Sequence, residues 1–392
     1  MDKVVKVGVI GVGNMGGAHA ACVYSGNIQG LQLVAACDIA QEKLEYCRQN
    51  YPGVALYSDW EALLQHPDLD AVIIAVPHPM HAEIAMAALK AGKHVQLEKP
   101  VDISVSRANA LNEVAKQTNK VFSITFNQRT NDLFQKAREI VQGGLLGEMK
   151  RSVWINTNWY RTQHYYDSGS WRATWSGEGG GVLINQAPHN LDMWQWICGM
   201  PSEITGFCDV AKYHKIEVED DVTIFARYPN GATGVFVTST GEAPGTNRLE
   251  VSGTLGKLVL ENGLLKWWKL QQSEREVCWQ SQENFERIPY EYEEITPQFK
   301  ESAHAGILQN FTNAILYGEK LLAPGVEGVN ELTISNAAYL SAWNGNTPVT
   351  LPLDTAAFDE KLAALASQSV EKQAEAKEKY NTAYQERWQV NW

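Results

Sequence analysis

The sequence predicts an α/β domain with a doubly wound parallel sheet, followed by an α+β domain built on an open, largely antiparallel sheet. Three observations support this prediction. A chain of 392 residues is too long for one ordinary hydrophobic core. Strand and helix patterns alternate as far as residue 126, which favours a parallel sheet, whereas short strands joined by turns predominate beyond it. We therefore expect two domains, 1–126 and 127–392.

The first domain alternates apolar runs with segments of helical spacing. Residues 4–10 (VVKVGVI) are apolar enough for a buried parallel strand. Further strands are expected at 31–38, 71–76, 94–97 and 121–126, with helices between them at 15–25, 41–50, 80–91 and 104–118.

The pattern changes in the second domain, where β-branched and aromatic residues recur in short runs joined by turns such as Pro229-Asn230-Gly231. Strands are expected at 148–159, 203–213, 221–228, 232–240, 246–252 and 257–261. Helices are expected at 131–142, 187–197 and 302–317, and over the tail at 355–388. We expect this domain to bind the substrate and to form the contacts of an oligomer.

The composition excludes several classes of protein. Hydrophobic residues make up 44% of the chain, which is typical of a packed globular protein. No run of about 18 apolar residues occurs, so we expect no membrane span. A formal charge of −12 repels a phosphate backbone, so we expect no nucleic-acid partner. The six cysteines are scattered without a CxxC pair, which favours a reducing cytoplasm and gives no zinc signature.

The pattern G-x-G-x-x-G lies directly after the first expected strand and opens a helix. It consists of Gly11, Gly13 and Gly16, with Asn14 and Met15 before the last glycine. Gly11 permits a tight turn, Gly13 lets the backbone approach a pyrophosphate, and Gly16 allows close packing of helix and strand. The helix N-terminus then offers N–H groups and a positive dipole end to the phosphates. The segment predicts a Rossmann domain that binds a dinucleotide.

An acidic residue, Asp38, ends the second expected strand, 22 positions after Gly16. A carboxylate at this place accepts hydrogen bonds from the ribose hydroxyls and repels a 2′-phosphate. The residues that follow it, 39–41, include no arginine or lysine. The expected cofactor is therefore NAD in preference to NADP.

Three blocks of sequence carry a resemblance to a known family. The first is Gly11–Gly16, the second is Glu98-Lys99-Pro100 preceded by Val76-Pro77-His78 and His81, and the third is Gly179-Gly180-Gly181 leading to Asn185 and His189–Asp192. In this order and spacing, the chain resembles the glucose–fructose oxidoreductase/inositol dehydrogenase (Gfo/Idh/MocA) family over about residues 4–350. Pro188 and the pair Trp171-Arg172 resemble a sugar-dehydrogenase subset of that family.

The resemblance implies that the protein oxidises a secondary hydroxyl of a sugar, glycoside or cyclitol to a ketone, with NAD as the hydride acceptor. It implies that His189 is the base, and an imidazole titrates near pH ~6.5. It implies that Lys99 holds the same oxygen and stabilises the developing alkoxide. The further residues expected at the cofactor are Val76, Pro77, His78, His81, Glu98, Lys99 and Asn127.

One residue departs from the family pattern. Many members carry aspartate four positions before the histidine, whereas this chain has Asn185. Asparagine takes neither a proton nor a negative charge. If the family's aspartate accepts a proton, that role passes to His189 here, and if it only binds a substrate hydroxyl, Asn185 can do the same. Asp192 lies three residues after His189 and is expected either to orient the imidazole or to hold another hydroxyl.

Other polar residues are candidates for the substrate pocket. Asn127, Gln128 and Arg129 follow the last strand of the first domain, and Tyr160, Arg161, Trp171 and Arg172 lie in a long irregular stretch. A subunit contact is the alternative for that stretch. The residues expected at the substrate are Lys99, Arg129, Tyr160, Trp171, Arg172, Asn185, His189 and Asp192.

Two further sequence patterns are not expected to form a functional site. His78 and His81 have H-x-x-H spacing but no evident third ligand, so no metal is expected. The acidic run Glu217, Glu219, Asp220 and Asp221 is expected to be a solvated strand end.

Alternative functions remain open. An NAD-dependent glycosidase would need a base beside a transient ketone, for which Tyr160, Tyr165 or Tyr166 could serve. A regulator that binds NAD or a sugar could use the same fold without catalysis, but it should have lost the pair Lys99 and His189. We also expect a cytoplasmic homodimer or homotetramer, because the open sheet and the Trp-rich segments 154–175 and 267–279 need cover.

Overall fold

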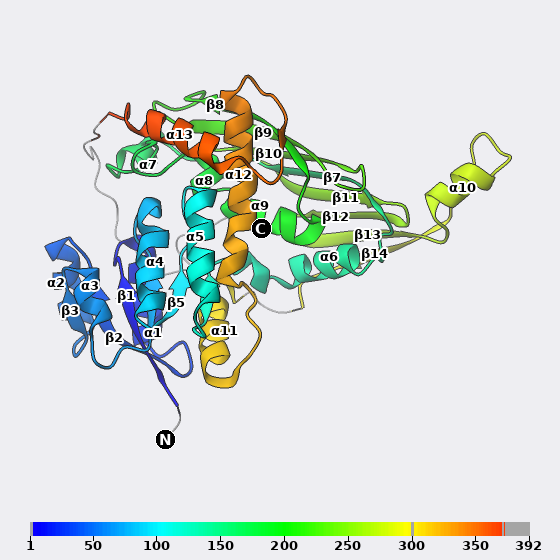
Figure 1. Ribbon diagram of the computed structural model, residues 1–392. Helices are drawn as coiled ribbons and strands as arrows, with labels where there is room; N and C mark the ends of the chain where they lie inside the picture. The colour runs from blue at the N-terminus through cyan, green and yellow to red at the C-terminus, as the bar shows by residue number, and fades with distance from the viewer. Residues whose placement is uncertain (1–2, 299–301, 371, 373–392) are drawn as a thin grey trace.

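The computed structural model describes residues 3–298, 302–370 and 372. Figure 1 shows two sheets in different parts of the molecule, with long helices between them and an arm that projects from the far end of the larger sheet. The two predicted sheets are therefore confirmed. Among the described residues no helix has the length and the apolar character needed to cross a membrane.

The first sheet has six strands in the order β3-β2-β1-β4-β5-β6, all parallel. Its strands are β1 (Val5–Ile10), β2 (Leu31–Cys37), β3 (Ala55–Tyr57), β4 (Ala71–Ile74), β5 (His94–Leu97) and β6 (Phe122–Ile124). Its helices are α1 (Asn14–Tyr24), α2 (Gln41–Asn50), α3 (Trp60–Leu64), α4 (His81–Lys90) and α5 (Val105–Lys116). The order reverses between β1 and β4, and such a switch point is where these sheets bind ligands.

The second sheet has nine strands in the order β14-β13-β12-β11-β7-β10-β9-β8-β15, and only β7 and β10 pair in parallel among the described strands. Its strands are β7 (Met149–Asn156), β8 (Glu203–Val210), β9 (Glu219–Arg227), β10 (Thr233–Ser239), β11 (Asn247–Gly253), β12 (Gly256–Glu261), β13 (Leu264–Leu270), β14 (Tyr290–Ile295) and β15 (Val349–Thr350). The six predicted strands are confirmed. Strands β13, β14 and β15 were not predicted from the sequence.

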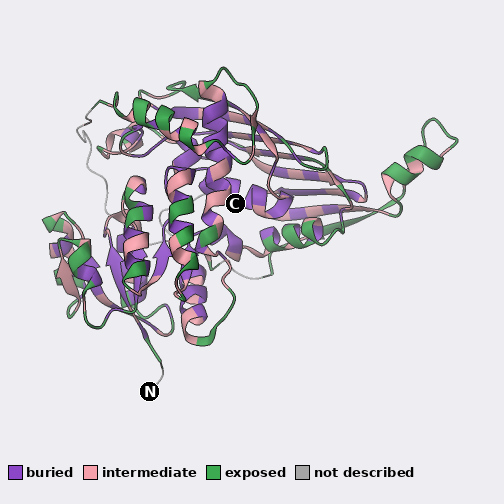
Figure 2. Cartoon of the chain, in the orientation of Figure 1, coloured by how far each residue is buried: buried purple, intermediate pink, exposed green. Residues whose placement is uncertain are grey.

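Helix α12 (Gly328–Trp343) was also missed, although it is a central element of the fold. It packs against β8 and α9 (Pro188–Cys198) on one side and against α5 on the other. Figure 2 shows it largely purple, because most of its residues are buried. A helix buried on every side lacks the single apolar stripe by which amphipathic helices are predicted.

The predicted helix at 302–317 is confirmed as α11 (Ala303–Tyr317). Two of its apolar residues, Leu308 and Phe311, belong to the same buried cluster as Val7 and Val9 of β1. The chain therefore returns to the first sheet after completing the second. The domain boundary at residue 126 stays a prediction.

The remaining predicted helices have mixed outcomes. The helix at 131–142 is confirmed as α6 (Asp132–Gln142), and the one at 187–197 as α9. In the tail, α13 (Thr355–Ala366) ends before residue 367, so the prediction is wrong for 367–370. Residues 371 and 373–388 of that prediction lie outside the described residues.

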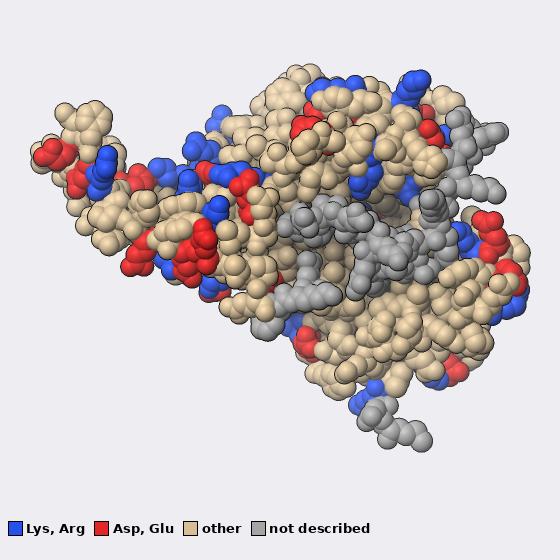
Figure 3. Space-filling model, turned by 180° about the vertical axis from the view of Figure 1, so that it is seen from behind, with Lys and Arg blue, Asp and Glu red and all other residues tan. Residues whose placement is uncertain are grey.

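The Trp-rich segments form apolar surface only in part. Trp154 and Trp159 are fully buried in the chain's own core, and Trp267 is buried as well. Trp279, within the segment 267–279, is 83% exposed and Phe285 is 94% exposed, both on the arm between β13 and β14. This arm carries α10 (Glu274–Gln280), and Figure 3 shows acidic and basic side chains interspersed along it.

Candidate active site

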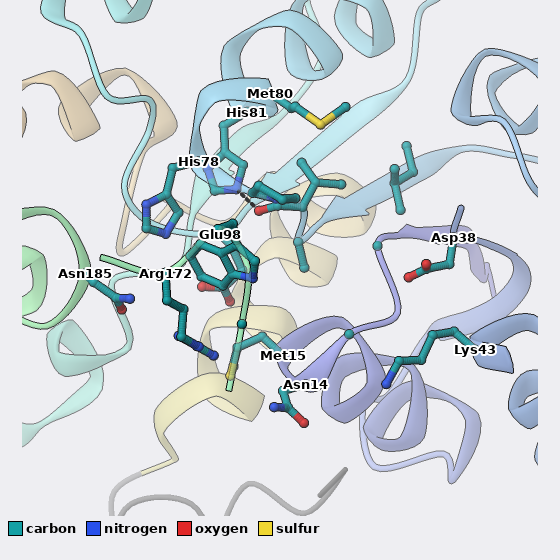
Figure 4. Close-up of a pocket in the computed structure, with 18 of the residues that line it drawn as sticks. Asn14, Met15, Asp38, Lys43, His78, Met80, His81, Glu98, Arg172 and Asn185 are labelled. Atoms are coloured by element: carbon teal, nitrogen blue, oxygen red, sulfur yellow. Dashed lines mark hydrogen bonds between the residues drawn. The ribbon is translucent and has the colours of Figure 1, made fainter. Parts of the chain in front are cut away.

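A cavity of about 1150 Å³ lies at the carboxyl ends of β1, β2, β4 and β5 and continues toward the second domain. Figure 4 shows Asp38 and Lys43 together at one end, and His78, Arg172 and Asn185 at the other. Below, the first is called the adenosine end and the second the substrate end. Pockets of this position and size bind dinucleotides and small substrates.

The residues between β1 and α1 fit a pyrophosphate. Gly11 has a φ of +82°, and a Cβ on Gly16 would lie 1.7 Å from the Gly11 carbonyl oxygen, so neither position accepts a side chain. A Cβ on Gly13 would meet no atom within 4 Å, so the described chain leaves space there for a ligand. Helix α1 starts at Asn14 without a capping side chain, and Asn14 and Met15 line the cavity. Phosphate oxygens suit such uncapped N–H groups.

Asp38 follows β2 directly and lines the cavity. Its Oδ2 accepts a hydrogen bond from the Val12 amide at 2.9 Å, and its Oδ1 accepts one from the Ala40 amide at 2.8 Å. These bonds fix the carboxylate beside the glycine turn. Lys43 of α2 lines the same end, a cation that the sequence analysis did not consider.

Two histidines fix the loops around the middle of the cavity. His81 Nδ1 lies 2.7 Å from the Pro100 carbonyl oxygen, and its Nε2 lies 2.8 Å from that of Val76. His78 Nδ1 lies 3.2 Å from the carbonyl oxygen of Glu178 in the second domain. The H-x-x-H pair therefore contacts backbone carbonyls, and no cluster of three metal-ligating side chains forms among the described residues. Val76 and Pro77 line the cavity as expected.

Glu98 is a buried carboxylate at the end of β5. Its Oε1 lies 2.7 Å from Nε2 of the buried His19. Burial alone would raise the pKa of Glu98, but the hydrogen bond from His19 and the charges of His19 and His304 outweigh it and lower the pKa to about 2. The ionised Glu98 leaves Lys99, the next residue, beside a permanent negative charge.

Lys99 lines the cavity and is half-buried. Its Nζ donates a hydrogen bond to the backbone carbonyl of Asn185 at 2.5 Å. Burial lowers the pKa of the Lys99 amine, while the carboxylates of Glu98, Glu331 and Glu178 oppose that shift. These carboxylates favour the charged form of the amine against the effect of burial.

His189 lies in the first turn of α9 and is 4% exposed. It lines the cavity together with Lys99 and Asn185. Burial, and then the charges of Lys99 and His304, lower the pKa of His189 well below its ordinary value. The imidazole is therefore neutral near pH 7 and able to accept a proton.

A polar cluster surrounds Asn185, the last residue of α8 (Val182–Asn185). The hydroxyl oxygen of Tyr165 accepts hydrogen bonds from Arg172 Nη1 at 2.9 Å, Gln186 Nε2 at 3.2 Å and Asn185 Nδ2 at 3.3 Å. Asn185 Nδ2 also donates to Glu178 Oε1. Trp171 forms a wall nearby, with its ring 5.7 Å from that of His78.

Six residues expected at the site do not line the cavity: Gly16, Asn127, Gln128, Arg129, Tyr160 and Asp192. Arg129 and Asp192, expected at the substrate, form a buried ion pair in which Nε and Nη2 donate to the two carboxylate oxygens at 2.9 and 2.7 Å. Asp192 therefore pairs with Arg129, not with the imidazole. Asn127 is buried outside the cavity, and Tyr160 points away with 51% of its surface exposed. These positions correct the sequence-based site.

Other residues at the site were not expected there. His304 at the start of α11 lines the cavity, and Glu178 lies directly behind Asn185. Only the place of Glu178 immediately before the three glycines could have drawn attention to it. Of the three tyrosines considered as the base of a glycosidase, Tyr165 stays a candidate because it lines the cavity. The buried Tyr166 forms a hydrogen bond with Thr240 through its hydroxyl.

The acidic run is not the solvated strand end that we predicted. Glu219 and Asp220 are fully buried. Glu219 accepts hydrogen bonds from the amides of Gly181 and Leu183 and thereby holds the start of α8. Burial raises the pKa of Glu219 to about 7. The carboxylate is tolerated there because backbone donors surround it.

The chain matches models of one protein family in two segments. Residues 5–126 match the oxidoreductase family with an NAD-binding Rossmann fold, and residues 134–259 match the GFO/IDH/MocA C-terminal domain. Myo-inositol 2-dehydrogenase of Thermotoga maritima is 27% identical over 264 residues, which cover 66% of this chain and 75% of that protein. The scyllo-inositol 2-dehydrogenase (NAD(+)) of Bacillus subtilis is 24% identical over 362 residues, covering 91% and 99%.

Solved structures share the fold. The WlbA dehydrogenase from Bordetella pertussis, in complex with NADH and UDP-GlcNAcA, has a TM-score of 0.75 at 22% identity, over 90% of this chain and 100% of that one. Levoglucosan dehydrogenase, in complex with NADH and L-sorbose, has a TM-score of 0.74 at 22% identity, over 90% and 100%. Both neighbours were solved with NADH, in keeping with an NAD-binding Rossmann domain here.

Proposed function

Because the chain belongs to the GFO/IDH/MocA oxidoreductase family, we propose that it oxidises a secondary hydroxyl of a sugar, glycoside or cyclitol to a ketone with NAD. The observation that carries this proposal is the meeting of Lys99, Asn185 and His189 in one cavity with the glycine turn. The named relatives act on inositols and levoglucosan, which are polyhydroxylated rings. Bound NAD supplies the hydride acceptor.

His189 is the proposed base. Removing a proton from an alcohol requires a neutral acceptor within hydrogen-bond reach of the hydroxyl. The low pKa of the buried His189 keeps its imidazole neutral near pH 7. Because the ring is almost fully buried, water competes little for the proton.

Lys99 is the proposed stabiliser of the alkoxide. Its Nζ lies in the same cavity as His189, and the Asn185 carbonyl holds it in place. A cation aimed at the oxygen lowers the cost of removing the proton, most of all in a site that excludes water. Trp171 offers an apolar wall to a ring face.

Asp38 is the proposed determinant of the preference for NAD. Two backbone amides fix its carboxylate at the adenosine end, where it meets the ribose hydroxyls and repels a 2′-phosphate. Asn14 and Met15 lie at the pyrophosphate.

The proposal is tested by mixing the protein with NAD and a panel of pyranoses, glycosides and inositols while following NADH absorbance. Steady NADH formation with at least one member of the panel is expected. A protein that binds NADH but oxidises no member would contradict the proposed function.

A second function is favoured by one observation. The Tyr165 hydroxyl accepts hydrogen bonds from three N–H donors, including the Arg172 guanidinium. This hydroxyl lines the cavity beside Asn185, which makes it the candidate for the base of an NAD-dependent glycosidase. Cleavage of a glycoside without net NADH formation would identify that activity. A non-enzymatic regulator is disfavoured because both Lys99 and His189 are present.

The assembly and compartment are also proposals. We infer a homodimer or homotetramer, because the arm exposes Trp279 and Phe285 beside the open sheet. We infer a cytoplasmic location, because all six cysteines are free thiols.

A further inference from the structure

The amide of Asn185 is held in one orientation. Its Nδ2 donates to Glu178 Oε1 and lies 3.3 Å from the Tyr165 hydroxyl oxygen. An asparagine amide has two N–H hydrogens and one carbonyl oxygen. Both hydrogens are therefore engaged, and the atom that remains for a ligand in the cavity is Oδ1, an acceptor.

Glu178 determines that orientation. It is 2% exposed, and its Oε2 accepts a hydrogen bond from the Ala173 amide at 2.5 Å, so the carboxyl group is fixed on both sides. Its backbone carbonyl lies 3.2 Å from His78 Nδ1, which ties the loop to the first domain. Burial raises the pKa of Glu178 above its ordinary value, while the charge of Arg172 and the hydrogen bonds from Ala173 and Asn185 oppose that shift.

Glu178 also links Asn185 to the lysine of the site. Its side chain contacts Asn185 and acts electrostatically on Lys99, although it does not itself line the cavity. A ligand in the cavity therefore meets the neutral oxygen of Asn185, and the carboxyl group lies one side chain further away.

We propose that Glu178 is a positioning residue that fixes Asn185 as a hydrogen-bond acceptor toward the cavity. The inference rests on the proposed function and narrows its substrate class: Asn185 Oδ1 selects a ligand that offers a hydroxyl hydrogen there, and not a carboxylate.

The test compares the unmodified protein with Glu178→Gln, Asn185→Asp and the double variant. Glu178→Gln alone frees the Asn185 amide group to rotate by 180°, because two amide groups can form a hydrogen bond in either orientation. Asn185→Asp alone places two buried carboxylates in contact, which repel. In the double variant, the new amide at position 178 donates to the new carboxylate at position 185, so one charge and one acceptor are restored.

We expect each single substitution to lower kcat/KM by about 10- to 100-fold. The double variant should recover to within about threefold of the unmodified protein, which is the opposite of additive losses. The kcat/KM profile of Asn185→Asp should also show an added ionisation that the double variant lacks. Asp167→Asn is the matched control, an acid of the same segment that bonds Gln163 outside the cavity, and should leave kcat/KM unchanged.

Thermal unfolding and NADH binding are measured for the unmodified protein, the two single variants, the double variant and the Asp167→Asn control. Both measurements are independent of turnover. The unfolding temperature should fall in Asn185→Asp and recover in the double variant. Additive losses in the double variant, or single variants that match the unmodified protein, would overturn the role of Glu178. If no substrate of the panel is oxidised, the proposed function fails, and the unfolding temperatures alone decide whether positions 178 and 185 interact.

Discussion

The two ends of the cavity are built in different ways. At the adenosine end the backbone provides the binding groups: a glycine turn, an uncapped helix start and one carboxylate held by two amides. At the substrate end the groups are titratable side chains, among them the half-buried Lys99 and the buried Glu178 and His189. The adenosine end depends on the shape of the backbone, whereas the substrate end depends on charged groups that are shielded from water. Substitutions should therefore act on binding at one end and on turnover at the other.

The largest loss is expected at the substrate end, from Lys99→Ala. Removing the cation should lower kcat by about 10²–10⁴-fold, because the alkoxide loses its stabilising charge. NADH binding, measured by fluorescence titration, should change little. Lys99→Arg should not restore turnover, since a guanidinium is larger and differently shaped. A Lys99→Ala protein that loses NADH binding instead of turnover would erase the distinction between the two ends.

At the adenosine end, Gly16→Ala and Gly13→Ala form a matched pair. A Cβ on Gly16 meets the Gly11 carbonyl, so Gly16→Ala should destabilise folding by about 1–3 kcal/mol and weaken NADH binding. A Cβ on Gly13 meets no described atom, so Gly13→Ala should keep the unfolding temperature and weaken NADH binding alone. Calorimetry and fluorescence titration separate the two effects. Equal unfolding temperatures for both variants would contradict the packing role of Gly16.

A smaller effect is expected from Asp38→Ser. Losing the carboxylate should reduce the preference for NAD over NADP by about tenfold, because its repulsion of the 2′-phosphate disappears. The ratio of kcat/KM values for the two cofactors measures this. Tighter binding of NADP than of NAD by the unmodified protein would show that Asp38 has another role.

The smallest effect concerns pH. A lowered pKa means that His189 gives up its proton at a lower pH than a free imidazole, so activity is lost only as pH falls through that lowered pKa. The acid limb of kcat/KM should therefore have its midpoint below 6.5, the ordinary value. A midpoint at or above 6.5 would indicate that burial does not determine the pKa of His189.

The same contrast explains how much could be predicted from the sequence. The glycine turn and Asp38 directly follow β1 and β2, so local patterns were enough to predict where they lie in the fold. Arg129 and Asp192 looked like substrate ligands because they are polar and near the blocks, yet they pair with each other in the core. Glu178 and His304 reach the site from segments whose approach depends on the whole fold.

The helix and strands that were not predicted from the sequence were missed for a similar reason. Helix α12 is buried on all sides, so its sequence shows no amphipathic period. Strands β13 and β14 continue the sheet by pairing with each other across the arm, and β14 is largely exposed. Neither the packing of α12 nor the pairing of β13 with β14 can be predicted from a short stretch of sequence.

The most direct test of the proposed chemistry is the turnover of His189→Ala with a substrate that the unmodified protein oxidises. We predict that kcat falls by about 10²–10⁴-fold while NADH binding persists, because the proton loses its acceptor. His164→Ala, which alters an exposed histidine outside the cavity, should turn over normally. Near-normal turnover of His189→Ala would contradict the account, because the proton would then leave the hydroxyl by a route that does not use His189.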